Sequence, residues 1–168
     1  MDAQLILSHQ QVIQISQRMA FQIFENHYQE HEMVFAGIED KGYLFAEAIL
    51  QEYKAISPNT KVALINVTLD KFSPTQSDIS LDSDISALQN KVVVLFDDVL
   101  NSGRTLAYSM KPFLNIPIKK LQIAVLVDRG HKSFPVSADY TGYELSTTLK
   151  EYIEVKFENK KITGVYLN

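Results

Sequence analysis

The sequence contains no cysteine and no tryptophan, and it has only six glycines and five prolines in 168 residues. The lack of cysteine excludes disulfide bonds and thiolate metal sites. No apolar run approaches the length of about 20 residues that a membrane-spanning helix needs. The N-terminus also lacks the basic, apolar pattern of a secretory leader. We therefore expect an unexported, cytoplasmic protein without a membrane segment.

Charge and composition limit the class of protein further. The formal net charge is -4, which argues against a surface that is positive throughout, although a local basic face is compatible with it. Hydrophobic residues make up 46% of the chain, enough for one domain with a proper core. We expect a single α/β domain over residues 1–168, without repeats or low-complexity tracts.

Helix-like and strand-like segments alternate along the chain, as in α/β proteins. The expected helices are amphipathic, the first of them with Ser8 as its N-cap: Gln10–Tyr28, Tyr43–Tyr53 and one that begins at Leu106. The expected buried strands are Met33–Ile38, ending in a turn at residues 39–42, Lys61–Leu69, Val92–Phe96 and Lys119–Val127. A C-terminal hairpin is expected from Ile153–Phe157 and Ile162–Leu167.

The segment Asp70–Gln89 differs in composition from the rest of the chain. Serine, threonine and aspartate dominate it, so we expect a loop that includes at most a short hairpin. Long loops inside compact domains are usually functional or disordered. A tolerated surface insertion is the plainer alternative.

The most informative stretch is Val92–Leu106, with the sequence VVVLFDDVLNSGRTL. Its apolar start is typical of a strand buried on both faces. Asp97 and Asp98 then fall at the expected carboxyl end of this strand, where open α/β sheets bind ligands. Small and hydroxyl-bearing residues follow, and they let backbone N–H groups approach an anion. Carboxylates beside an anion site fit sugar hydroxyls or a hard divalent cation, although an Asp pair alone can simply stabilise a turn.

Two segments resemble known protein families. DDVLNSGRT, at residues 97–105, resembles the PRPP-binding motif of type I phosphoribosyltransferases. VLVDRGHKSFPVSADY, at residues 125–140, resembles the base-binding region of the pyrimidine-operon attenuator family called PyrR, whose members double as uracil phosphoribosyltransferases. The resemblance implies a type I phosphoribosyltransferase fold: a central, mostly parallel sheet flanked by helices, a flexible hood loop at about residues 70–90, and the C-terminal hairpin.

The same resemblance implies an activity and assigns residues to it. The reaction would transfer the phosphoribosyl group of PRPP to uracil or a related free base, with Mg²⁺ as cofactor. The candidate catalytic residues are Asp97, Asp98 and Lys71. The 5-phosphate would be bound by Asn101, Ser102, Gly103, Arg104 and Thr105, and pyrophosphate by Lys41 and Gly42. The base would be bound by Val127, Asp128 and Arg129, and the metal by Asp128 and otherwise mainly through PRPP and water.

Two positions depart from the family pattern. The family has arginine where this chain has Lys41 and Lys71, and lysine lacks the two-pronged geometry that matches a diphosphate. Asp40 and Asp70 add negative charge beside these lysines. Both lysines are also compatible with ordinary solvated side chains. The alternative to an enzyme is therefore a weakly catalytic sensor of nucleotide or PRPP that acts through RNA or a protein partner.

The remaining candidates carry less weight. Asp128 and Arg129 are equally explained by an ion pair that stabilises a turn. His131 has no acid or metal partner in the sequence and is not assigned to catalysis. The first helix offers Arg18 as its one arginine or lysine, so RNA binding is not expected, without being excluded. The resemblance also leads us to expect a homodimer.

Overall fold

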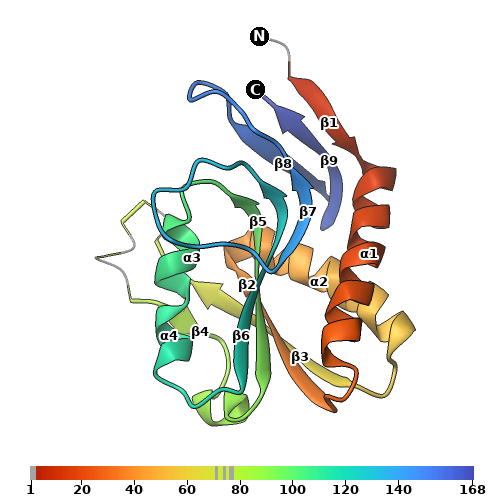
Figure 1. The fold of residues 1–168 in the computed structure, drawn as a ribbon, viewed down its shortest axis with the longest axis vertical. Coiled ribbons are helices and arrows are strands. Elements are labelled where there is room, and N and C mark those ends of the chain that lie inside the picture. Colours follow the sequence, from red (N-terminus) through yellow and green to blue (C-terminus); the bar gives the residue numbers. More distant parts are fainter. Residues whose placement is uncertain (1–2, 71, 74, 76–77) are drawn as a thin grey trace.

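The computed structural model describes residues 3–70, 72–73, 75 and 78–168. They form two sheets with helices packed against them (Figure 1). In spatial order, the larger sheet contains β4 (Ser80–Leu81), β3 (Lys61–Thr68), β2 (Glu32–Ile38), β5 (Val92–Leu100), β6 (Lys120–Asp128) and β7 (Tyr140–Glu144). The smaller sheet contains β1 (Gln4–Ser8), β9 (Lys161–Leu167) and β8 (Ile153–Glu158). The helices are α1 (His9–His27), α2 (Glu39–Ile56), the 3-10 helix η1 (Ile85–Leu88), α3 (Arg104–Ser109) and α4 (Lys111–Leu114).

Five strands of the larger sheet run parallel, and the short edge strand β4 is antiparallel to β3. β5 lies between β2 and β6, so that Val94 pairs with Phe35 on one side and with Gln122 on the other. Because the parallel strands end at the same edge, the residues that follow β2, β5, β6 and β7 are brought together there.

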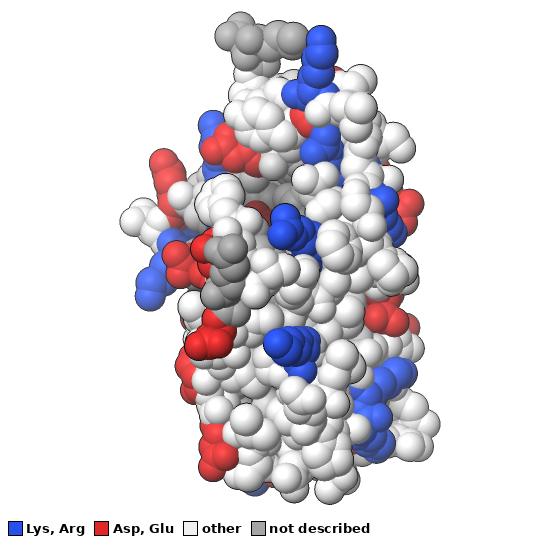
Figure 2. Space-filling model, turned by 90° about the vertical axis from the view of Figure 1, so that its left-hand side faces the viewer, with Lys and Arg blue, Asp and Glu red and all other residues white. Residues whose placement is uncertain are grey.

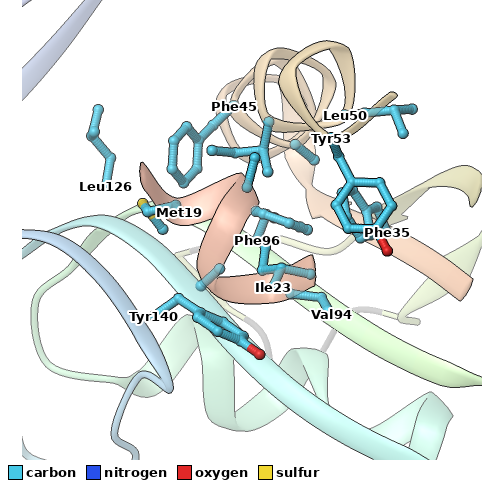
Figure 3. Close-up of a cluster of buried hydrophobic side chains, with 14 of the residues drawn as sticks. Met19, Ile23, Phe35, Phe45, Leu50, Tyr53, Val94, Phe96, Leu126 and Tyr140 are labelled. Atoms are coloured by element: carbon cyan, nitrogen blue, oxygen red, sulfur yellow. The ribbon is translucent and has the colours of Figure 1, made fainter. Parts of the chain in front are cut away.

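Alternate side chains of β5 enter two separate cores. Val94 and Phe96 pack on the face covered by α1 and α2, where Figure 3 shows them beside side chains of both helices. Val93 and Leu95 pack on the opposite face, together with Phe113 of α4. Helices on both faces explain why this strand has no polar alternation.

The start of α1 connects the two sheets. Ser8 ends β1 and caps the helix: its hydroxyl accepts from the Gln11 N–H at 3.4 Å, and the Gln11 side chain accepts from the Ser8 N–H at 2.9 Å. This reciprocal capping box confirms Ser8 as the N-cap. The smaller sheet lies beyond the carboxyl edge of the larger one, next to the candidate ligand-binding loops (Figure 1).

The α/β fold, the mostly parallel sheet and the C-terminal hairpin are as predicted from the sequence. The segment predicted as a loop with a short hairpin contains β4, paired with the end of β3, and the helix η1. Its role as a hood stays a prediction. None of the described helices combines the length and apolar character needed to cross a membrane.

Three predicted boundaries were wrong. Residues 39–42 form the first turn of α2 rather than a separate turn. β5 continues through both aspartates to Leu100, because its ladder with β6 extends to the end of that strand. The helix expected from Leu106 begins at Arg104.

Candidate active site

The two adjacent aspartates line two different cavities at the carboxyl edge of the sheet. Asp97 and Asp98 are 3% and 8% exposed, and the Asp98 N–H donates to Asp97 Oδ1 at 3.0 Å. Asp97 lines a cavity of about 290 Å³ together with residues 99–106, whereas Asp98 lines one of about 530 Å³ together with residues that follow β2 and β3. Successive strand residues point to opposite sides, so the pair divides the site into two halves.

The first half, which we call the phosphate cavity, is lined by Asp97 and residues 99–106. The structure brings together all five residues predicted to hold the 5-phosphate. Gly103 has a φ of +80°, a left-handed conformation that favours glycine, and the turn there leads directly into α3. The Ser102 carbonyl accepts from the N–H groups of Ser133 and Phe134 at 2.8 and 3.0 Å. Hydrogen bonds from residues outside the loop therefore hold it in place.

The second half, which we call the acidic cavity, is lined by Glu39, Asp40, Lys41, Leu69, Asp70, Phe72 and Asp98. Four carboxylates thus face one lysine among its lining residues. Figure 2 shows this side of the molecule, where acidic and basic side chains gather around a hollow in the upper half. Lys71, predicted to be catalytic, lies outside the described residues. Carboxylates at this density repel a polyanion.

Lys41 and Gly42 lie in the first turn of α2 rather than in a loop. The Lys41 ammonium donates to the Val155 carbonyl of β8 at 3.0 Å. Gly42 packs on the backbone of β5, where an added Cβ would lie 2.6 Å from the Phe96 carbonyl oxygen. Glu39, which opens the helix, has a φ of +52°. The predicted pyrophosphate residues are therefore beside the cavity, but the lysine is engaged by the smaller sheet.

The predicted base-binding residues follow β6. The Val127 side chain is fully buried in the core, and the residue pairs with Val99 of β5 and Tyr143 of β7. Asp128 pairs with Lys132 at 3.1 Å, and its other oxygen accepts from the Gly130 N–H at 2.9 Å. Arg129 is buried and donates hydrogen bonds only to protein groups among the described residues.

No group of three or more His, Asp or Glu side chains among the described residues is arranged to hold a metal ion. Asp128, the predicted metal ligand, has both carboxylate oxygens engaged by Lys132 and Gly130. Asp98 has no side-chain partner within the described part of the chain. A divalent cation in this site would therefore be held mainly by oxygens of its ligand and by water, which agrees with the reluctance of Mg²⁺ to give up its waters.

The sequence analysis missed one segment that borders the site, residues 146–151 between β7 and β8. Thr147, Thr148 and Glu151 all accept hydrogen bonds from Arg129. The carbonyl of Thr147 also lies 2.6 Å from His131 Nε2. No local sequence pattern predicts these contacts, because they join residues that are 16 to 22 positions apart.

Comparison with known proteins agrees with this geometry. A model of the phosphoribosyl transferase domain family matches residues 2–158. A protein named bifunctional protein PyrR from Macrococcus caseolyticus is 31% identical over 166 residues, which cover 94% of each chain. A protein of the same name from Alkaliphilus metalliredigens is 30% identical and covers 89% of this chain and 86% of its own.

Solved structures share the fold at lower sequence identity. A hypoxanthine-guanine phosphoribosyltransferase from Bacillus anthracis superimposes with a TM-score of 0.77 at 18% identity, covering 96% of this chain and 97% of its own. A hypoxanthine phosphoribosyltransferase from Trypanosoma cruzi gives a TM-score of 0.78 at 14% identity, covering 96% and 95%. By its fold and its match to the family model, the chain belongs to the phosphoribosyl transferase domain family, among its PyrR-like members.

Proposed function

We propose that this protein transfers the phosphoribosyl group of PRPP to uracil or a related free base, releasing pyrophosphate. The observation that carries the proposal is the placement of Asp97 and Asp98 between two cavities, one of them lined by the complete Asn101–Thr105 loop. A sugar that carries a phosphate at one end and a leaving group at the other fits such a divided site.

Each half of the site has a distinct task in this reaction. The phosphate cavity holds the 5-phosphate through backbone N–H groups and the Ser102 and Thr105 hydroxyls. Asp97 and Asp98 accept hydrogen bonds from the ribose hydroxyls. The transition state resembles the oxocarbenium ion of glycoside cleavage, and the nearby Asp98 carboxylate stabilises its positive charge. Catalysis by this chain then consists of positioning and electrostatics.

Pyrophosphate leaves through the acidic cavity. Lys41 already donates to Val155 and carboxylates dominate the described lining, so the charge that neutralises pyrophosphate there would come from Mg²⁺ when it is bound. We therefore propose that PRPP binds to this site as its Mg²⁺ complex. Removing Mg²⁺ with EDTA should weaken the binding of PRPP strongly and leave the binding of ribose 5-phosphate almost unchanged, as measured by calorimetry.

The choice of uracil as the proposed base rests on the resemblance to the PyrR family and on relatives that carry that name. The test is a panel of free bases incubated with the protein, Mg²⁺ and PRPP, in which nucleotide and pyrophosphate are both quantified. Equal amounts of the two products with uracil support the proposal. Products with a purine only would reassign the base, and the absence of both products with every base would refute the proposed transfer.

The second candidate is a weakly catalytic sensor of nucleotide or PRPP. It is favoured by the acidic cavity and by the engagement of Lys41. Such a protein binds its ligand without turnover, and saturation with ligand at 100 times its Kd stabilises the fold by about 2.7 kcal/mol. Thermal unfolding with UMP or PRPP, run beside the base panel, separates the two candidates.

We also propose that the protein is cytoplasmic, that it forms a homodimer, and that it does not bind RNA. Arg18, the candidate RNA contact of α1, donates from Nη2 to the carbonyls of Thr141 and Gly142 at 3.0 and 2.6 Å, which engages one nitrogen of its guanidinium. Light scattering should give twice the chain mass of 19.1 kDa. Titration with a transcript of a pyrimidine operon leader at physiological salt should give no saturable binding.

A further inference from the structure

Arg129 is the one buried cation among the lysines and arginines that the structure describes, with 8% of its surface exposed. Taking a guanidinium out of water is costly unless its donors are paired. Arg129 makes four side-chain hydrogen bonds, all to acceptors of the protein. The sequence places it in the base region, but its contacts assign it a different role.

The guanidinium reaches two separate segments. Nη1 donates to Asn101 Oδ1 at 3.0 Å, at the start of the phosphate loop. Nε donates to Thr147 Oγ1 at 2.6 Å, and Nη2 donates to the carbonyls of Thr148 and Glu151 at 2.9 and 2.5 Å. The planar, forked geometry of arginine allows one side chain to serve acceptors in several directions, which lysine cannot do.

The fold explains why these segments meet at Arg129. β6 lies between β5 and β7, with Leu100 paired to Asp128 and Asp128 paired to Glu144. The residues that follow the three strand ends are therefore neighbours. Arg129 follows the middle strand, and its own N–H donates to the Leu100 carbonyl at 2.9 Å.

Residues 146–151 have little else to hold them in place. None of their side chains is buried, and Leu149 at the apex is 88% exposed. Apart from the contacts with Arg129, the segment is held by His131 at the Thr147 carbonyl and by an internal hydrogen bond from the Thr148 N–H to Glu151 Oε2 at 2.6 Å. Arg129 accordingly provides most of the polar contacts that fix this segment.

We infer that Arg129 is a positioning residue that couples the phosphate loop to residues 146–151. It sets the orientation of Asn101, and through it the shape of the phosphate cavity, without touching the phosphate. The affinity for a 5-phosphate therefore depends on contacts made outside the cavity. This inference rests on the proposed function only in naming the ligand, since the coupling itself is a property of the free protein.

The ligand test uses ribose 5-phosphate, which has the phosphate and sugar but no base and no pyrophosphate. Arg129→Ala and Arg129→Lys should each lower its affinity by about tenfold in calorimetry, which corresponds to about one net hydrogen bond, here the one from Arg129 to Asn101 that holds the phosphate loop. Added guanidinium ion should partly restore the affinity of Arg129→Ala. Thr147→Val should weaken binding in the wild-type background and have no effect in Arg129→Ala.

Arg18→Ala is the matched control, because Arg18 also donates two hydrogen bonds to backbone carbonyls, at β7, but contacts neither segment. It should leave the affinity for ribose 5-phosphate unchanged. An unchanged affinity in Arg129→Lys, with a melting temperature well above that of the assay, would overturn the inference.

Hydrogen exchange of the free protein separates this inference from the proposed function. Arg129→Lys should speed amide exchange in residues 101–105 and in residues 146–151 together. Faster exchange in residues 146–151 alone would reduce Arg129 to a local contact and overturn the coupling, whether or not the wild type binds ribose 5-phosphate. If the wild type does not bind the sugar phosphate but both segments loosen together, the coupling stands and the proposed ligand is wrong.

Discussion

The two cavities on either side of Asp97 and Asp98 differ in charge and in construction. The phosphate cavity is formed by one continuous segment, from the end of β5 to the start of α3, and its Ser102 carbonyl and Asn101 side chain are fixed by hydrogen bonds from outside this segment. The acidic cavity is assembled from residues that follow β2 and β3 and from Asp98 of β5, and its described lining holds four carboxylates and one lysine. In the proposed reaction, binding of the sugar phosphate would therefore depend on local backbone geometry, whereas binding of pyrophosphate would depend on charge that the ligand brings with it.

Among the changes considered, replacing Asp98 should have the largest effect, and this effect should fall on catalysis rather than on binding of the sugar phosphate. Asp98→Asn keeps the shape of the side chain but removes the charge that faces the developing cation. We expect kcat to fall about 100-fold, in the range of other electrostatic contributions to catalysis, with little change in the affinity for ribose 5-phosphate. Steady-state kinetics and calorimetry measure the two quantities. A loss below threefold would contradict the electrostatic role of Asp98.

The two glycines of the site should differ in their sensitivity to a methyl group. Gly42→Ala should lower the free energy of unfolding by about 2 kcal/mol, since its Cβ would meet the Phe96 carbonyl at 2.6 Å. Gly103→Ala should cost about 1 kcal/mol, because its Cβ has ordinary contacts but its φ of +80° is unfavourable for alanine. Denaturant unfolding of both variants tests the order, and the reverse order would contradict it.

Removing one charge from the acidic cavity should improve binding of pyrophosphate. Asp40 is exposed and contributes charge to the lining, so Asp40→Asn should raise the affinity for PRPP about threefold at low salt, in keeping with the modest energies of exposed charges. The affinity for ribose 5-phosphate, which does not reach this cavity, serves as the internal control. An equal gain in affinity for PRPP and for ribose 5-phosphate would contradict the separate roles that the charges of the two cavities indicate.

The smallest expected effect concerns pH at the segment that Arg129 holds. The hydrogen bond from the Thr148 N–H, with a smaller contribution from the Arg129 charge, lowers the pKa of Glu151 below its usual value of 4.5. A carboxyl whose pKa is lower in the folded state stabilises the fold above its unfolded pKa and loses this contribution as pH falls. Exchange of the Thr148 amide should therefore accelerate more below pH 4.5, relative to intrinsic rates, than that of Ser57, whose N–H donates to the backbone carbonyl of Tyr53 at 2.8 Å.

Glu151→Gln is the control for this pH dependence. It keeps an oxygen acceptor for the Thr148 N–H but cannot titrate. Its exchange at Thr148, corrected for the intrinsic rate, should vary little with pH over the range in which the wild type changes. The same pH dependence in the variant would assign it to a different group.

The sequence predicted the elements whose signals are local. β5 was evident because both faces of the strand are buried, and Ser8 was recognisable because capping needs only the next turn of the chain. The start of α2 was missed because Ile38 offers no side-chain cap, because Gly42 stands in the first turn, and because Glu39 enters the helix from a left-handed conformation. The strand β7 was missed since three of its five residues are at least partly exposed and it lies at the edge of the sheet.

The site was predictable to the same extent. The Asn101–Thr105 loop is contiguous, so its residues had to meet. Most partners of Arg129 and Lys41 were not predictable, because three of them are backbone carbonyls, those of residues 148, 151 and 155, which lie far from the two side chains in the sequence. Residue identity alone carries no information about such acceptors.

The hydrogen-bond ladder of β5 has a consequence for how this site can change. Asp97 and Asp98 face different cavities only because they are successive residues of a strand that is paired on both sides. A shift of the strand register by one residue would turn each of the two acids toward the opposite face. It would also turn the core side chains of Val94 and Phe96 to the wrong face. The positions of the two acids are therefore held by the packing of the whole domain, while the charges around each cavity come from other segments. In the proposed reaction, mutations in those segments would change the binding of the leaving group without moving the two acids that contact the sugar.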